Sequence, residues 1–148
     1  MNIALLGAGH IGQTIARLLH GSGDYRVCVI DKNPAALARL HAEGIATRLI
    51  DSADGGALLA ELRRGHQTVV NALPYQLAVA SATLALEAGC HYFDLTEDVA
   101  ATQAIQRLAD GAATAFMPQC GLAPGFIGIV AHHLAQRFET LQIGRAHV

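Results

Sequence analysis

The sequence predicts an α/β protein with a doubly wound parallel sheet of six strands, and three observations support this fold class. Short apolar runs alternate along the chain with segments of helical periodicity, as in repeated β-α units. The apolar runs are continuous, which is typical of strands buried on both faces. The first run leads directly into a glycine-rich loop, the usual connection to the first helix of such sheets. Right-handed crossovers then give the strand order 3-2-1-4-5-6.

The individual elements are assigned from apolar runs, caps and breakers. Strands are expected over residues 2–6, 26–30, 45–50, 68–73, 91–95 and 113–118. The second helix has Asn33 as its N-cap and Pro34 at its first position. The third opens with residues 51–54, the fourth spans 74–88, and a last helix covers 131–138. Thr96 is expected to cap the fifth helix, with Glu97 and Asp98 in its first turn.

Length and composition fit one compact domain. The chain has 148 residues, of which 52% are hydrophobic and 15% charged, so it can bury a sizeable core. A net charge of −2 provides no basic field, and we expect neither a nucleic-acid nor a membrane partner. Met1 leads straight into the first strand, and three cysteines form no C-x-x-C pair. These features predict a cytoplasmic protein without a signal peptide.

The loop Gly7-Ala8-Gly9-His10-Ile11-Gly12 has the G-x-G-x-x-G spacing that holds the pyrophosphate of a dinucleotide. Gly7 permits the tight turn off the strand, and Gly9 lets the pyrophosphate approach the backbone. Gly12 lets the helix pack closely. With His10 and Ile11, these residues place the phosphates at a helix N-terminus, which favours an anion by roughly 0.3–1 kcal/mol.

Asp31 ends the second strand about 20 residues after this loop, where a carboxylate typically binds the ribose hydroxyls of the adenosine. The alternative is a strand-end carboxylate that only caps the next helix. A 2′-phosphate would meet a like charge at Asp31, so we expect NAD as the cofactor. Lys32 adjoins Asp31 and could soften this repulsion, which keeps NADP open.

The turn that leaves the fourth strand lies at the switch point of the sheet, where ligands of such folds bind. Asn71, Leu73, Pro74 and Tyr75 are therefore expected to contact the cofactor, at its nicotinamide end. Helix initiation alone is the alternative, since Pro74 fits a first helical position equally well. Asp94 ends the fifth strand at the same edge and is the one catalytic candidate. It could meet a ribose or a substrate ammonium, or simply cap a helix.

Three blocks of the chain together resemble the saccharopine dehydrogenase-like proteins, in the lysine 6-dehydrogenase and saccharopine reductase branch. They are Asn71-Ala72-Leu73-Pro74-Tyr75, Gly89-Cys90-His91-Tyr92-Phe93-Asp94 and Pro118-Gln119-Cys120-Gly121-Leu122-Ala123-Pro124-Gly125. The resemblance runs from Met1 to about Leu141, and its last block is the most specific. It implies NAD(P)-linked oxidation of an amine on a lysine- or saccharopine-like amino acid, or the reverse reduction of an imine.

The predicted organisation is a dinucleotide-binding Rossmann domain over residues 1–123, followed by the start of a connection to a missing substrate domain over 124–142. Residues 143–148 are interpreted as a non-native tail, with an ordinary frayed end as the alternative. We therefore expect the front part of a longer enzyme, inactive by itself. The full-length protein is expected to be a homo-oligomer whose amino-acid substrate binds through the missing domain.

A second function class remains open, namely a non-catalytic NAD-sensing domain like those that regulate potassium transporters. The glycine loop and the segments 29–34 and 51–54 resemble those domains, whereas the block over 120–125 favours the dehydrogenase. No metal is expected, because His132 and His133 are adjacent and point about 100° apart on a helix. Cys28, flanked by valines, is expected to be an inert core residue.

Overall fold

The structure is a computed structural model that describes residues 1–123 and 125–140. Six parallel strands form one sheet in the order β3-β2-β1-β4-β5-β6, which confirms the predicted fold class and strand order. The strands are β1 (Asn2–Leu6), β2 (Arg26–Asp31), β3 (Ala46–Leu49), β4 (Thr68–Asn71), β5 (His91–Asp94) and β6 (Phe116–Met117). Leu6 pairs with Ile30 and Asn71, and Asn71 pairs with Asp94. The carboxyl ends of the four central strands therefore share one edge.

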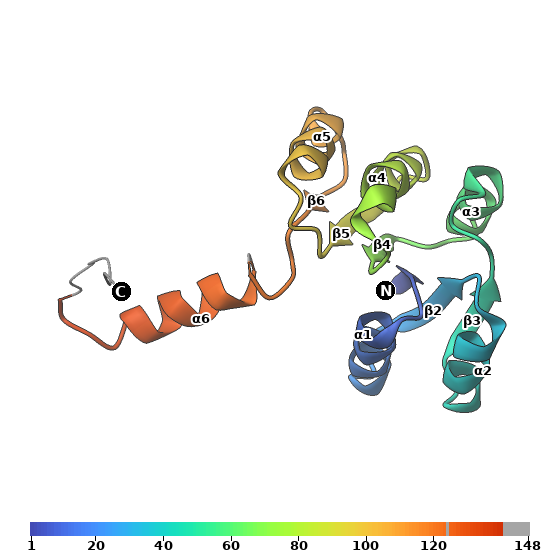
Figure 1. The fold of residues 1–148 in the computed structure, drawn as a ribbon, viewed down its shortest axis with the longest axis horizontal. Helices are drawn as coiled ribbons and strands as arrows, with labels where there is room; N and C mark the ends of the chain where they lie inside the picture. Colours follow the sequence, from blue (N-terminus) through green and yellow to red (C-terminus); the bar gives the residue numbers. More distant parts are fainter. Residues whose placement is uncertain (124, 141–148) are drawn as a thin grey trace.

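Helices cover both faces of this sheet (Figure 1). Helices α1 (His10–Gly21) and α2 (Pro34–Ala42) lie on one face. The other face carries α3 (Gly55–Leu62), α4 (Ala78–Glu87) and α5 (Val99–Ala109). A short 3₁₀ helix, η1 (Tyr75–Leu77), precedes α4, and α6 (Phe126–Ala135) extends away from the sheet. In the described part of the chain, no helix combines the length and the apolar character that crossing a membrane requires.

Two buried clusters, one on each face of the sheet, explain why the strands read as continuous apolar runs. Leu6, Ile30 and Tyr92 point toward α3, α4 and α5, whereas their neighbours in sequence, such as Leu5 and Val29, point toward α1 and α2. Each of these side chains is fully buried. Burial of one such aliphatic side chain contributes roughly 1.5–3 kcal/mol, so neither face tolerates a polar residue at these positions.

The cap expected at Thr96 is wrong. Helix α5 begins at Val99, and the carboxylate of Asp98 accepts a hydrogen bond from the backbone N–H of Ala101 at 2.7 Å. Thr96 lies before the helix and is tied down by Asp94, whose Oδ1 accepts a hydrogen bond from the Thr96 N–H at 3.1 Å. The Thr96 hydroxyl also accepts a hydrogen bond from the N–H of Asp98 at 3.3 Å, so residues 94–98 form a local turn and Asp98 is the cap.

Two predicted helices also have different starts. Pro74 has an extended conformation, with ψ of 146°, so it precedes η1 instead of occupying the first position of a continuous helix over 74–88. Helix α6 begins at Phe126, because the chain turns at Gly125 with φ of +126°. The described part of the connection predicted over 124–142 thus contains α6. Residues 124 and 141–142 of that connection, and the tail predicted over 143–148, lie outside the described residues.

Candidate functional site

The glycine-rich loop joins β1 to α1 at the carboxyl edge of the sheet, and two of its glycines are required by close backbone contacts. Gly7 has φ of +100°, and a Cβ there would lie 3.0 Å from the carbonyl oxygen of Ala72. A Cβ at Gly12 would overlap the carbonyl oxygen of Gly7. Gly7 therefore makes the expected tight turn, and Gly12 allows the helix to approach the loop itself.

Gly9 has a different environment, since a Cβ there would meet no atom within 4 Å. It is the N-cap of α1, in an extended conformation and without any side-chain cap. The next residues are also exposed, with Ile11 63% accessible. The first N–H groups of a helix lack intrahelical partners and carry a partial positive charge. This uncapped end is therefore suited to an anionic group such as a pyrophosphate.

The carboxylate of Asp31 lies beside the glycine-rich loop and accepts two backbone hydrogen bonds. Its Oδ2 accepts a hydrogen bond from the N–H of Ala8 at 2.6 Å, and its Oδ1 accepts one from the N–H of Asn33 at 2.7 Å. Asp31 thus ties the glycine loop to the start of α2. A carboxylate has about four acceptor positions, so these two bonds leave room for the ribose hydroxyls expected there.

A pocket of about 220 Å³ opens beside this carboxylate. Its polar lining comprises Asp31, Lys32, Asp51 and Ser52, and its apolar lining comprises Leu73, Pro74 and Leu77. The hydroxyl of Ser52 is buried and has no hydrogen-bond partner among residues 1–123 and 125–140. Such an unsatisfied group costs about 1–3 kcal/mol, so a ligand that bonds to it would relieve the cost. The polar and apolar sides of this pocket fit the ribose and the base of an adenosine, respectively.

The turn after β4 adjoins the pocket beside Asp31. Leu73 and Pro74 line that pocket, and contact of this turn with the nicotinamide stays a prediction. The side chain of Asn71 is 2% exposed and turned into the protein, where Nδ2 donates to the hydroxyl of Tyr92 at 2.9 Å. Tyr75 is 55% exposed in η1. The amide of Asn71 therefore supports the turn from within, because a parallel register places it beside β5.

Asp94 is buried, with only 1% of its surface accessible. Its Oδ1 accepts hydrogen bonds from the N–H groups of Thr96 and Gln119, both at 3.1 Å, and its Oδ2 accepts one from the hydroxyl of Tyr92 at 3.0 Å. The Asp94 carbonyl also accepts a hydrogen bond from Cys120 at 2.8 Å. In this geometry Asp94 is a positioning residue that anchors the chain leaving β6, and a catalytic role for it stays an untested prediction.

Tyr92 connects Asn71 and Asp94, and no pattern in the sequence indicates this role. Burial, reinforced by the nearby charge of Asp94, raises the pKa of the Tyr92 phenol far above its usual range. The phenol therefore remains a neutral hydrogen-bonding group between Asn71 and Asp94. Ser52 was also missed, because a serine in an acidic turn carries no distinctive spacing.

Residues 3–116 match a family model described as the saccharopine dehydrogenase NADP binding domain. Among solved structures with a similar fold is the L-Glu-forming saccharopine dehydrogenase from Saccharomyces cerevisiae, with a TM-score of 0.78 and 23% sequence identity. That match covers 92% of this chain and 31% of the yeast chain.

Two other oxidoreductases share the fold. A putative myo-inositol dehydrogenase from Sinorhizobium meliloti has a TM-score of 0.70 and 22% identity, over 94% of this chain and 42% of that one. A biliverdin reductase from Synechocystis, solved with biliverdin and NADP⁺, has a TM-score of 0.65 and 20% identity. That match covers 79% of this chain and 37% of the reductase. The chain thus spans well under half the length of each of these proteins.

The family match covers more than half of the chain and includes the glycine loop, Asp31 and the Ser52 pocket. The uncapped start of α1 and the unsatisfied hydroxyl of Ser52 fit the cofactor that this family binds. The chain therefore belongs to the saccharopine dehydrogenase NADP-binding domain family, as an NAD(P)-binding Rossmann domain of the oxidoreductase type.

Proposed function

We propose that this chain is the cofactor-binding part of an amino-acid dehydrogenase that oxidises a C–N bond of a lysine- or saccharopine-like substrate, with NAD as hydride acceptor. The observation that carries the cofactor half of the proposal is the pocket at Asp31 and Ser52, next to the uncapped helix α1. The substrate class rests on the family and on the resemblance of the blocks around Asn71, Asp94 and Cys120.

The choice of NAD rests on the charges around the pocket. Asp31 and Asp51 both line it, and a 2′-phosphate would have to approach these two carboxylates. Two like unit charges about 4 Å apart repel by roughly 4 kcal/mol at an effective dielectric of 20, which is an upper bound for an open site. Lys32 is the counter-charge, but its Nζ lies 3.8 Å from Asp51 and its side chain is 73% exposed. Lys32 is therefore partly neutralised before a phosphate arrives.

The bound nicotinamide supplies the hydride-accepting carbon, and this chain's own residues bind and orient the dinucleotide. The loop over 7–12 holds the pyrophosphate, Asp31 and Ser52 hold the adenosine ribose, and Leu73 and Pro74 shield the apolar side of the pocket. Amine oxidation also needs a base to take a proton from the substrate nitrogen. In this proposal that base and most of the substrate pocket belong to a part of the protein beyond this chain.

Equilibrium titration of the chain with NADH and NADPH, followed by nicotinamide fluorescence, tests the cofactor half. We expect NADH to bind at least about tenfold more tightly, which corresponds to about 1.4 kcal/mol. Asp31→Asn should reduce this preference, because it removes a charge facing the 2′ position. Asp24→Asn, in an exposed turn, is the matched control and should change neither affinity. Tighter binding of NADPH by the unmodified chain would overturn the choice of NAD.

A further inference from the structure

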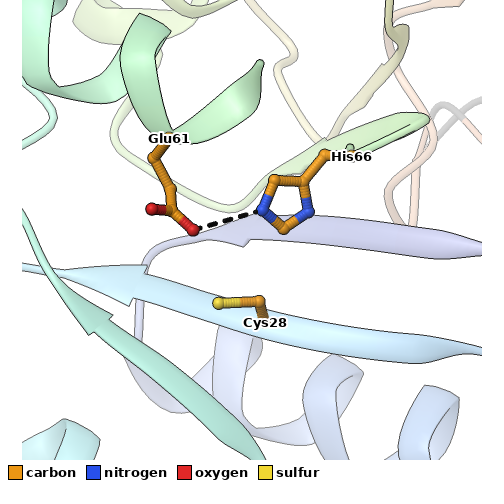
Figure 2. Close-up of side chains that lie close together, drawn as sticks. All are labelled: Cys28, Glu61 and His66. Atoms are coloured by element: carbon orange, nitrogen blue, oxygen red, sulfur yellow. Dashed lines mark hydrogen bonds and ion pairs between the residues drawn. The ribbon is translucent and has the colours of Figure 1, made fainter. Parts of the chain in front are cut away.

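A second group of chemically reactive side chains lies away from the dinucleotide pocket. Cys28 is on β2, Glu61 is in the last turn of α3, and His66 is in the loop that leads into β4 (Figure 2). One ligand atom from each residue lies within 4.8 Å of the other two. Cys28 is the third residue of β2 and His66 precedes the first residue of β4, whereas Asp31 lies at the carboxyl end of β2. The cluster is therefore distinct from the dinucleotide pocket.

The three side chains are buried, which is unusual for ionisable groups. Glu61 is 6% exposed, Cys28 is 9% exposed, and the side chain of His66 is 10% exposed. The Nε2 atom of His66 faces Glu61, whereas Nδ1 is buried without a hydrogen-bond partner among the described residues. An ion at the cluster would therefore bind Nε2, and Glu61 and Cys28 would supply the other two donor atoms.

The distances suit a tetrahedral ion. The Nε2 atom of His66 lies 3.4 Å from Oε1 of Glu61, which is long for a hydrogen bond. Two ligands held about 2.0–2.2 Å from a tetrahedral zinc ion are separated by roughly 3.3–3.5 Å. The Cys28 sulfur would need to approach by on the order of 1 Å to complete a third zinc bond of about 2.3 Å. The imidazole and carboxylate thus already have the required separation.

A cavity of about 140 Å³ adjoins the cluster and is lined in part by Cys28, His66 and Arg64. A water molecule occupies about 30 Å³ in the liquid, so this space can hold an ion's remaining water ligand. Asn2 and Gly65 also line this cavity, which is open to solvent.

Arg48 and Arg64 form ion pairs with Glu61 and would compete with a cation for its carboxylate. The Nε of Arg48 lies 3.4 Å from Oε1, and an Nη of Arg64 lies 3.2 Å from Oε2. Both are substantially exposed, with side-chain accessibilities of 49% and 67%, so either can turn into water when an ion binds. Removal of one arginine should therefore strengthen binding of a cation, whereas it would weaken a purely structural ion-pair network.

We propose that Cys28, Glu61 and His66 form a site for a zinc-type divalent ion, with a fourth position that faces the cavity and holds water. The Cys28 thiol loses its proton to solvent when the ion binds, so the ligands are a thiolate, a neutral imidazole and a carboxylate. This donor set favours zinc over magnesium or calcium. The ion ties β2, α3 and the start of β4 together. The expectation of no metal was based on His132 and His133 and did not consider this cluster, so the titration below tests both.

The test uses the 148-residue chain, stripped of metal and titrated with Co²⁺ and then with Zn²⁺. We expect one equivalent of Co²⁺ to give a thiolate-to-cobalt charge-transfer band and the visible bands of a tetrahedral ion, both of which Zn²⁺ removes. Cys28→Ser and His66→Gln should each lower zinc affinity by more than about 100-fold, the upper end of the loss seen for outer partners of metal ligands. Cys120→Ser, at an exposed cysteine, is the matched control and should leave both signals unchanged.

Two further variants keep the proposal testable if Cys28→Ser does not fold. The chain has three cysteines, so a Cys90→Ser, Cys120→Ser double variant retains only Cys28, and its cobalt-thiolate band can come only from that residue. Absence of the band in this variant would overturn the site. Arg64→Gln should bind zinc several-fold more tightly, because the arginine no longer competes with the ion for the Glu61 carboxylate. Weaker binding would contradict the proposed site.

Discussion

The carboxylate of Asp31 accepts a hydrogen bond from the backbone N–H of Ala8 at 2.6 Å, which joins the end of β2 to the glycine-rich loop. The residue expected to recognise the adenosine ribose therefore also holds the loop expected to bind the pyrophosphate. A substitution at Asp31 should therefore affect binding of both the adenosine ribose and the pyrophosphate.

Gly12→Ala should destabilise the fold and abolish dinucleotide binding, because the new Cβ would overlap the carbonyl oxygen of Gly7. We expect a loss of about 1–3 kcal/mol in the free energy of unfolding, as for other overpacked sites. Gly21→Ala lies in the same helix where nothing is within 4 Å, and it should be neutral or stabilising. Urea denaturation compares the two variants, and equal stabilities would show that the loop can relax.

Ser52→Ala should change binding and stability in opposite directions. The Ser52 hydroxyl has no partner in the part of the chain that the structure describes, so its removal should leave the free energy of unfolding unchanged or slightly higher. If the hydroxyl bonds to the cofactor, NADH affinity should fall by about 0.5–1.5 kcal/mol, or roughly two- to twelvefold. Thermal melting and fluorescence titration of the same preparation measure both effects. An unchanged affinity would remove Ser52 from the cofactor site.

The buried phenol of Tyr92 should make stability decrease at alkaline pH. Its pKa is raised in the folded protein by burial and by Asp94, whereas the unfolded chain ionises at about pH 10. The contribution is fully present below that pH and is lost as the pH rises above it, because only the unfolded state releases the proton. Tyr92→Phe should flatten this decrease in urea midpoints measured from pH 9 to pH 11. An equally steep decrease in the variant would assign it to other groups.

The 148-residue chain should bind dinucleotide without oxidising an amino acid. Hydride transfer requires the substrate to be held about 3–3.5 Å from the nicotinamide, and the match to the yeast enzyme covers only 31% of that protein. Incubation with NAD and lysine or saccharopine, monitored for NADH, should give no signal above background. Turnover by this chain would refute the proposal that it binds the cofactor but needs another part of the protein for catalysis.

A longer parent protein should oxidise one of these amines, and there Asp94→Asn should lower turnover more than it weakens NAD binding. A parent that leaves both amines unchanged, while NAD alters its association with a transporter, would support the sensing function instead.

The sequence predicts those features that depend on residues close together in the chain. The loop over 7–12, the strand that ends in Asp31 and the N-cap at Asn33 are all local patterns. The choice of Asp98 over Thr96 as a cap was missed, because both residue types are good N-caps and they lie only two positions apart.

Sites built from separate elements were missed for a different reason, namely that their residues are far apart in the sequence. Cys28, Glu61 and His66 come from three separate elements, and each one reads locally as a core, helix-face or loop residue. The role of Tyr92 likewise depends on the register that places β5 beside β4. Spacing along the chain carries no information about such partners until the sheet order and register are known.

Hydrogen exchange in helix α6 should show whether another surface covers this helix. It spans 10 residues, and its side chains Phe126 and Ile129 are 58% and 70% exposed. Isolated helices of that length are marginal in water, because most of their stability comes from packing against other elements. Amide hydrogens of α6 should therefore exchange with deuterium orders of magnitude faster than those of β1 and β4. Slowing of that exchange would reveal when the apolar side of α6 becomes covered.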